Sequence, residues 1–274
     1  MAGLSNKILG YYPTYSDVKA LEYTMPRNIK FGLDHILGID GPFPGFKLRH
    51  PYSTDGTEEL FQNYGCTLLM PGVMEEYQKF QFAMNWARYH KYNYVLLLGS
   101  DEWLEGDINI IKEQLDKHED GLAKIFDLEV IEHTSNKWNS GWKRVWKIFS
   151  HPDKIKSDLV HWGYYLNGSK IPYQIEGTLL KGAVLHHDDG IRDVQRNRLM
   201  TEYQDWNVPR EREILKRIAK RDKSGFALQR MLLEHDFPPT IGLDGTKYYS
   251  CGCIESKTGY YNTLCIRHER GIRR

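Results

Sequence analysis

The sequence lacks three features that would each identify a class of protein. It has four cysteines in 274 residues, too few for a disulfide-stabilised scaffold. It has no apolar run of membrane-spanning length, and its first residues lack the apolar core of a secretory signal peptide. It has no charge excess, because 37 Lys and Arg residues face 36 Asp and Glu residues. We therefore expect a cytoplasmic protein with no transmembrane segment and no nucleic-acid partner.

Aromatic side chains, in contrast, are abundant. The chain has 18 Tyr, 7 Trp and 10 Phe. Many of these rings must lie in a hydrophobic core, which a chain of this length is large enough to form. Flat rings with polar edges also suit sugar and base recognition, so the composition mildly favours a carbohydrate or nucleotide ligand.

The most informative segment runs from Tyr94 to Leu104. An apolar stretch of strand length, 94–98, is followed closely by the adjacent carboxylates Asp101 and Glu102. A strand that is apolar on both faces is typical of the centre of a covered α/β sheet, where ligands collect at the carboxyl ends of the strands. After Trp103 and Leu104 we expect a helix capped by Asp107.

The rest of the chain predicts an α/β fold. We expect one helix to begin at Asp17 and to be interrupted at Pro26. A second helix is expected to begin at Asp55, with Glu58 three residues on in a capping arrangement. Two further helices are expected over 75–91 and about 108–118. Strands are expected at 7–12, 35–40, 66–70, 94–98, 123–133, 142–149 and 179–187. Strand and helix alternate over the first 120 residues, which indicates mostly parallel strands, whereas the later strands read as more antiparallel.

The C-terminal part reads differently. A basic amphipathic helix or helix pair is expected over 210–235, followed by a hairpin-like appendage over 247–266. We therefore place a domain at 1–205 and an extension at 206–274. The extension contains four soft potential metal ligands, Cys251, Cys253, Cys265 and His268. They could hold a structural Zn²⁺, but their spacing fits no standard zinc finger, and simple burial of the cysteines is the alternative.

Taken in order, several motifs resemble those of family 2 glycosyltransferases of the GT-A fold. Residues 13–16, Pro-Thr-Tyr-Ser, are similar to the family's end of the first strand. Asp40 and the 53–57 stretch, Ser-Thr-Asp-Gly-Thr, are similar to its second strand end and next helix start. Ala87-Arg88 and then Ser100-Asp101-Glu102 are similar to its acidic metal motif. The resemblance covers about residues 7–200.

The resemblance implies a Rossmann-like mixed sheet flanked by helices and a glycosyltransferase of the hexosyltransferase type. The donor that the resemblance implies is a nucleotide diphosphate sugar, expected to be UDP-linked, and the acceptor is a carbohydrate or other hydroxyl compound, with inversion. The donor-binding residues that it implies are Pro13, Thr14, Tyr15, Asp40, Lys79, Ser100 and Asp101. The alternative interpretation of Asp40 is a purely loop-fixing role, and the alternative for Lys79 is an ordinary solvated lysine.

A divalent metal, Mn²⁺ or Mg²⁺, is expected at the acidic motif. Adjacent carboxylates after a buried strand suit such hard ions, which makes Asp101 and Glu102 candidate ligands. The resemblance adds His187, in the run His-His-Asp-Asp, as the late ligand of the site. Gly99 replaces the first acid of the family's Asp-x-Asp signature. Weaker metal affinity, a compensating role for Glu102 or water, and a metal-independent enzyme all remain open.

The general base is the least determined assignment. An inverting transfer needs a group that takes the proton of the acceptor hydroxyl. Related enzymes place a His-Glu or Glu-Asp pair near 158–162, where this chain has Asp158, His161 and Trp162. His161 and Asp158 are the two candidates, and Glu176 is a further one.

Two other readings stay open. A nucleotidyltransferase could use a similar sheet, but it would need a glycine-rich, lysine-containing phosphate loop after the first strand, which residues 13–17 do not supply. A catalytically degenerate module that binds nucleotide sugars is favoured by Gly99 and Trp162, which replace expected acids.

Overall fold

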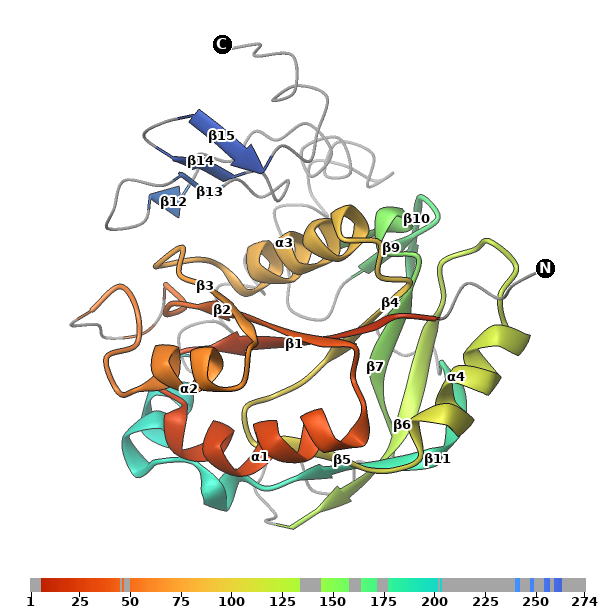
Figure 1. Ribbon diagram of the computed structural model, residues 1–274, viewed down its shortest axis with the longest axis horizontal. Helices are drawn as coiled ribbons and strands as arrows, with labels where there is room; N and C mark the ends of the chain where they lie inside the picture. The colour runs from red at the N-terminus through yellow and green to blue at the C-terminus, as the bar shows by residue number, and fades with distance from the viewer. Residues whose placement is uncertain are drawn as a thin grey trace, which may run out of the picture.

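The computed structural model describes residues 6–44, 46, 50–133, 144–157, 164–171, 177–201 and 203. It also describes the backbone of four short strands, β12 (Thr240–Ile241), β13 (Lys247–Tyr248), β14 (Ile254–Ser256) and β15 (Gly259–Asn262). Within the described residues an eight-stranded mixed sheet runs through the molecule, with helices on both faces (Figure 1). The predicted Rossmann-like, GT-A type of α/β sheet is therefore confirmed.

The eight strands follow the order β3-β2-β1-β4-β7-β6-β11-β5. Their first half, β3 to β4, is parallel, whereas β7 pairs antiparallel with both β4 and β6, and β5 pairs antiparallel with β11. This agrees with the expected change from parallel to more antiparallel pairing. The bounds are β1 Ile8–Thr14, β2 His35–Asp40, β3 Thr67–Leu69, β4 Tyr94–Leu97, β5 Glu102–Gly106, β6 Ile125–Glu132, β7 Arg144–Ser150 and β11 Thr178–His187.

Helices cover the sheet unequally. The helices α1 (Val18–Phe31), α2 (Thr57–Asn63) and α4 (Ile108–Lys117) contribute to one hydrophobic core, and α3 (Glu76–Tyr89) contributes to another. Figure 1 shows α3 on the opposite side of the sheet from α1 and α2. A small three-stranded sheet, β8 (Ile155–Ser157), β9 (Tyr164–Leu166) and β10 (Ser169–Ile171), packs with α3. Short 3₁₀ turns lie at η1 (Pro152–Lys154) and η2 (Asp189–Ile191).

The two cores explain why the central strands read as continuously apolar. Alternate side chains of β4 enter opposite cores: Val95 lies in the α3 core, and Tyr94 and Leu96 lie in the α1 core. All three side chains are 1% exposed or less. Burial on both faces removes the polar half of the usual strand alternation, so only the strand's end can carry a polar group.

The predicted start of α1 at Asp17 is confirmed in position but lacks the side-chain cap, and the predicted cap of α2 at Asp55 is wrong. Asp17 occupies the N-cap position of α1 but makes no side-chain cap bond; its carboxylate accepts from the Tyr15 amide instead. Asp55 accepts at 3.0 Å from the Val18 amide, so it supports the start of α1. The N-cap of α2 is Gly56, at φ 102°, and no capping box forms there. The predicted Asp107 cap of α4 is confirmed, because its carboxylate accepts from the Asn109 amide.

The helix α1 continues through Pro26, contrary to the expected interruption. Beyond Pro26, the buried side chain of Asn28 donates to the Glu102 carbonyl at 2.9 Å and accepts from the Leu104 amide at 2.8 Å. These bonds to the edge strand β5 hold the last turns of α1 on the sheet, so tertiary contacts offset the local cost of proline.

That edge strand itself was not expected. After Asp101 the sequence predicted only a helix start at Asp107, yet Glu102–Gly106 forms β5 and pairs with Ala183–His187 of β11. The strand β5 is only five residues long, and its sequence has no apolar run that would distinguish it from a loop. Its partner arrives some 80 positions later, and this pairing brings the Asp101 turn to the end of β11.

The C-terminal strands β12 to β15 form a separate antiparallel sheet, and β14 with β15 is the hairpin-like part of the predicted appendage. The predicted helix at 210–235 lies outside the described residues, and the boundary near 205 stays a prediction. Among the described helices, none combines the length and apolar character needed to cross a bilayer.

Candidate active site with an acidic metal-type cluster

Three ionisable side chains meet where β4 and β11 end. Asp101 lies in the turn between β4 and β5, His187 is the last residue of β11, and Asp189 lies in η2. The His187 Nε2 atom is 3.1 Å from Asp101 Oδ2 and 3.5 Å from Asp189 Oδ1. One ligand atom from each residue lies within 4.8 Å of the others. The structure thus brings together two predicted ligands, Asp101 and His187, with a third that the sequence reasoning did not name.

Glu132 fixes the orientation of the histidine. It is the last residue of β6 and lies opposite His187 in the parallel β6–β11 pair. Its Oε2 atom is 2.6 Å from His187 Nδ1. A carboxylate on one ring nitrogen favours the tautomer whose other nitrogen, here Nε2, is free to bind a metal. Glu132 was missed because a strand glutamate near a polar turn gives no signal before its register with β11 is known.

The electrostatics of the cluster favour charged groups. Burial alone would raise the pKa of Asp101, but the Arg192 guanidinium and the His187 imidazole hold it well below its usual range. Burial alone would lower the pKa of His187, but the Asp101 carboxylate and further acids raise it to about 10. Positive charge is therefore strongly preferred beside the buried Asp101, whether it comes from a proton on His187 or from a metal ion.

Arg192 is the other cation of the cluster. Its Nη2 atom is 2.8 Å from Asp101 Oδ1, its Nη1 atom is 3.4 Å from Asp189 Oδ1, and its Nε donates to Ser100 Oγ at 3.4 Å. In the sequence, the only signal for Arg192 is its position just after the His-His-Asp-Asp run. Ser100, predicted to contact the donor, is 3% exposed, and its carbonyl accepts from the Thr24 hydroxyl.

Glu102 does not join the cluster. Both of its carboxylate oxygens accept from the ammonium of Lys147 on β7, at 2.7 and 2.8 Å, and one also accepts from the Gly99 amide. The Glu102 carboxylate is therefore committed to a buried ion pair and to the turn that displays Asp101. The predicted compensation of Gly99 by Glu102 has no support in this arrangement.

Gly99 has a steric reason. A Cβ at this position would lie 2.7 Å from Asp101 Oδ1 and 3.2 Å from Glu102 Cδ. Any larger residue would force the Asp101 carboxylate to move. The turn therefore presents one acid, Asp101, rather than the pair that the resembling family uses.

The donor atoms fit a divalent metal of the Mn²⁺ type. Two carboxylate oxygens and one imidazole nitrogen make a mixed set that suits such ions. Asp101 Oδ2 is buried and accepts no hydrogen bond, although it faces His187 Nε2. A metal ion at this oxygen would compete with the proton on His187, while Arg192 contacts the other carboxylate oxygen, Oδ1.

The predicted nucleotide contact Asp40 lies fully buried at the end of β2. Its Oδ2 accepts from the Ser53 amide at 2.7 Å and its Oδ1 from the Ser53 hydroxyl at 2.6 Å. Burial raises the pKa of Asp40 to about 6, although the two Ser53 bonds oppose the shift. This geometry is that of the loop-fixing alternative.

Lys79 is fully buried rather than solvated. From α3, its ammonium donates to the carbonyls of Thr14 and Gly41 and lies 4.9 Å from the Phe43 ring centroid. Burial lowers the pKa of Lys79 to about 7, although nearby acids, Asp40 first, oppose the shift. Lys79 thus ties the ends of β1 and β2 together.

The end of β1 lines the neighbouring loop cluster. Pro13 is half-buried, and Thr14 and Tyr15 are buried. The Tyr15 hydroxyl donates to the His50 carbonyl at 3.1 Å, and its ring packs in a small cluster with Phe43, Phe46 and Tyr203.

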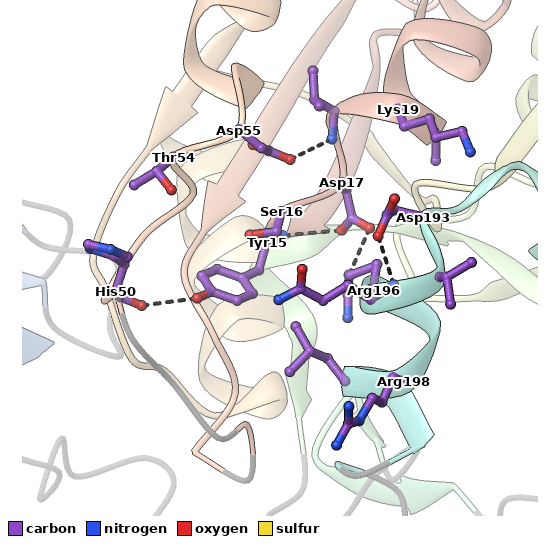
Figure 2. Close-up of a pocket in the computed structure, with 15 residues that line it drawn as sticks. Tyr15, Ser16, Asp17, Lys19, His50, Thr54, Asp55, Asp193, Arg196 and Arg198 are labelled. Carbon is purple, nitrogen blue, oxygen red and sulfur yellow. Dashed lines mark hydrogen bonds and ion pairs between the residues drawn. The ribbon is translucent and has the colours of Figure 1, made fainter.

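A cavity of about 960 Å³ opens beside these residues (Figure 2). It lies between the β1–α1 turn, the start of α1 and the segment 193–199, and its wall includes Tyr15, Asp17, Lys19, Asp55 and Arg196. Asp101, His187 and Asp189 are not part of its wall. Arg192, however, precedes the cavity segment by one residue, so the cavity and the acidic cluster are neighbours.

Several predicted residues lie outside the described part of the chain. These are the candidate bases His161, Asp158 and Glu176, and the candidate zinc ligands Cys251, Cys253, Cys265 and His268. Both assignments stay predictions.

No protein-family model matches the chain, and no curated protein matches it. Among solved structures, the chain is similar to S. aureus TarS, at 13% identity over 47% of this chain and 22% of that chain, with a TM-score of 0.36. For TarS 1–349 the identity is 12% over 84% of this chain and 76% of that chain, with a TM-score of 0.39. For a cytidylyltransferase from Leptospira borgpetersenii the identity is 13% over 54% of this chain and 61% of that chain, with a TM-score of 0.33. The chain spans about a fifth of the first of these proteins, and identities and scores of this size assign neither family nor activity.

Proposed function

We propose that the chain is a glycosyltransferase that takes a sugar from a nucleotide diphosphate donor, a UDP-sugar, with the help of a divalent metal. The observation that carries the proposal is the cluster of buried Asp101 and His187 with half-buried Asp189 at the carboxyl edge of the sheet, with Glu132 orienting His187. Carboxyl ends of parallel strands are where α/β sheets bind their ligands. The acceptor in this reaction is a hydroxyl compound, and the transfer is inverting.

Asp101, His187 and Asp189 would hold the metal, Mn²⁺ or Mg²⁺. Its chemistry would be to neutralise the charge that develops on the leaving diphosphate. Around it, Glu132 keeps the imidazole of His187 in position, and the Glu102–Lys147 pair fixes the turn that carries Asp101. A base among His161, Asp158 and Glu176 would take the acceptor proton.

The nucleoside would lie near the ends of β1 and β2. Tyr15 offers a ring at this edge, whereas Asp40 and Lys79 act through the loops that they hold, because both are completely buried. We therefore assign Asp40 and Lys79 to shaping the donor pocket rather than to direct contact with the nucleotide.

A metal-independent variant of the same transfer is favoured by one observation. Arg192 already contacts Asp101 at 2.8 Å and Asp189 at 3.4 Å. If this guanidinium, released from Asp101, binds the diphosphate, it supplies the positive charge itself. In that case EDTA leaves transfer unchanged and Arg192→Gln abolishes it.

Titration of UDP into the protein by calorimetry tests the metal-assisted proposal. With Mn²⁺ present, UDP should bind at least about tenfold more tightly than in EDTA, because an ion held by Asp101, His187 and Asp189 would supply positive charge for the diphosphate. His187→Gln, which removes the nitrogen ligand, should abolish the difference, while His118→Gln, at the C-cap of α4, should preserve it. Equal UDP affinity with and without Mn²⁺ in the wild type would reject the metal-assisted form.

A further inference from the structure

The carbonyl groups on both sides of Asp101 are bonded to one helix. The Thr24 hydroxyl donates to the Ser100 carbonyl at 2.7 Å. The Asn28 side-chain amide donates to the Glu102 carbonyl at 2.9 Å. Thr24 and Asn28 are four residues apart on α1, so they lie on the same face of the helix, and both are fully buried. The helix therefore holds the backbone just before and just after the buried acid of the cluster.

Asn28 takes the place of a neighbouring strand. β5 is the last of the eight described strands of its sheet, so the backbone groups on its outer edge face no further strand there. Asn28 supplies both kinds of bond to this edge, because its oxygen also accepts from the Leu104 amide at 2.8 Å. Its remaining N–H donates to the Tyr12 hydroxyl on β1. Both N–H donors and the oxygen of the Asn28 side chain are thus used, which anchors the side chain to two strands.

The helix is the firmer partner in this contact. α1 is 14 residues long, and its buried face, which includes Leu21 and Met25, packs in the hydrophobic core. It lies along the five-residue strand β5 (Figure 1). The turn before β5 has a backbone bond of its own, from the Glu102 amide to the Gly99 carbonyl at 3.1 Å. A long helix with a packed face holds site residues more precisely than a short turn does.

The position of the Asp101 carboxylate follows from this backbone. The Asp101 carbonyl itself accepts from the Asp188 amide at 3.1 Å, next to the end of β11. Since α1 bonds the carbonyls before and after it, a movement of Asp101 would break buried hydrogen bonds. We propose that Thr24 and Asn28 are positioning residues, which keep the Asp101 carboxylate against His187. That this placement serves a metal ion and a nucleotide donor rests on the proposed function.

A role in stability alone makes a different prediction. Each bond also gives a partner to a buried carbonyl group, which stabilises the fold. If that were the whole effect, a variant would have a lower free energy of unfolding, but its folded molecules would keep the cluster unchanged. A positioning role changes the cluster in the folded protein. The test must therefore measure the cluster itself.

The central variant is Thr24→Val, because valine has a shape close to that of threonine but no hydroxyl. Thr24→Ser keeps the hydroxyl. Thr67→Val is the matched control, because it removes a hydroxyl that contacts His35 on β3, at the other end of the sheet. In a titration followed by manganese resonance, Thr24→Val should bind Mn²⁺ about tenfold more weakly than wild type, the lower end of the loss when a group that supports a metal ligand is removed. Thr24→Ser and Thr67→Val should bind it as wild type does.

A second measurement needs no metal. In EDTA, the proton between His187 Nε2 and Asp101 Oδ2, which are 3.1 Å apart, gives a proton resonance that nitrogen-15 labelling of histidine identifies. Thr24→Val should shift this resonance, and Asn28→Ala should shift it too. Thr24→Ser and Thr67→Val should leave it in place. Thr24→Val decides the matter if Asn28→Ala does not fold.

The inference and the proposed function fail separately. An unmoved His187 resonance in Thr24→Val overturns the inference, and so does an unchanged Mn²⁺ affinity of this variant when wild type binds the ion. Effects that Thr67→Val reproduces, or that Thr24→Ser does not reverse, overturn it as well. If wild type binds no Mn²⁺, the metal-assisted function is rejected, and the His187 resonance alone decides whether α1 positions Asp101.

Discussion

At the scale of single residues, the cluster depends on Glu132, which holds His187 but faces no ligand itself. Glu132→Gln should lower the affinity for Mn²⁺ about 10- to 100-fold, because the ring loses the carboxylate that orients it. Glu129→Gln, an exposed glutamate on the same strand, is the control and should have no effect. Calorimetry or manganese resonance titration measures both. Equal Mn²⁺ affinity in Glu132→Gln and wild type would mean that Glu132 does not position the ligand.

Asp40 has a thermodynamic consequence that is separate from catalysis. Since burial raises its folded-state pKa from 3.8 to about 6, the folded protein binds a proton more tightly than the unfolded chain does. The free energy of unfolding should therefore fall as pH rises from about 4 to 6.5, by up to about 3 kcal/mol from this group. Asp40→Asn should show a smaller fall over the same range. An identical pH dependence in both proteins, by urea unfolding, would show that Asp40 does not carry a raised pKa.

At the scale of elements, the close approach of β5 to β11 requires a glycine at position 106. Gly106 has φ 134°, and a Cβ there would lie 2.2 Å from the Gly182 carbonyl oxygen on β11. Gly121 also has a positive φ, 76°, but has nothing within 4 Å. Gly121→Ala should cost about 1–2 kcal/mol from backbone strain alone, and Gly106→Ala a further 1–3 kcal/mol, roughly, from the collision. Urea midpoints compare the two variants, and equal losses would contradict the close β5–β11 packing.

Elements with strong local signals could be predicted, and those set by distant partners could not. The strand at 35–40 agrees with β2, and those at 94–98 and 179–187 differ from β4 and β11 by one residue at one end. The short strand β5 and the continuation of α1 through Pro26 depend on β11 and Asn28, which no local pattern contains. The sequence placed Asp101 and His187 correctly in one cluster. It did not reveal Asp189, Arg192 or Glu132, whose roles arise from strand register and from a turn beyond β11.

At the scale of the whole molecule, the sheet brings several ionisable groups to one edge. The carboxyl ends of β1, β2 and β4 carry Tyr15, Asp40 and Asp101, and the parallel ends of β6 and β11 carry Glu132 and His187. The middles of β1, β2 and β4 are apolar on both faces, whereas β6 and β7 carry the buried charged residues Asp127 and Lys147. The fold therefore prepares a metal-type cluster and a neighbouring cavity side by side.

The most direct measurement is the release of UDP from a panel of UDP-sugars, with Mn²⁺, by wild type, Asp101→Asn and Asp153→Asn. Asp153 is an exposed acid in η1, so its variant controls for the chemical change itself. The account predicts release by wild type and Asp153→Asn, and a loss of at least about 100-fold in Asp101→Asn, the scale of removing a main electrostatic stabiliser. Release by Asp101→Asn at the wild-type rate would contradict a reaction centred on the Asp101 cluster.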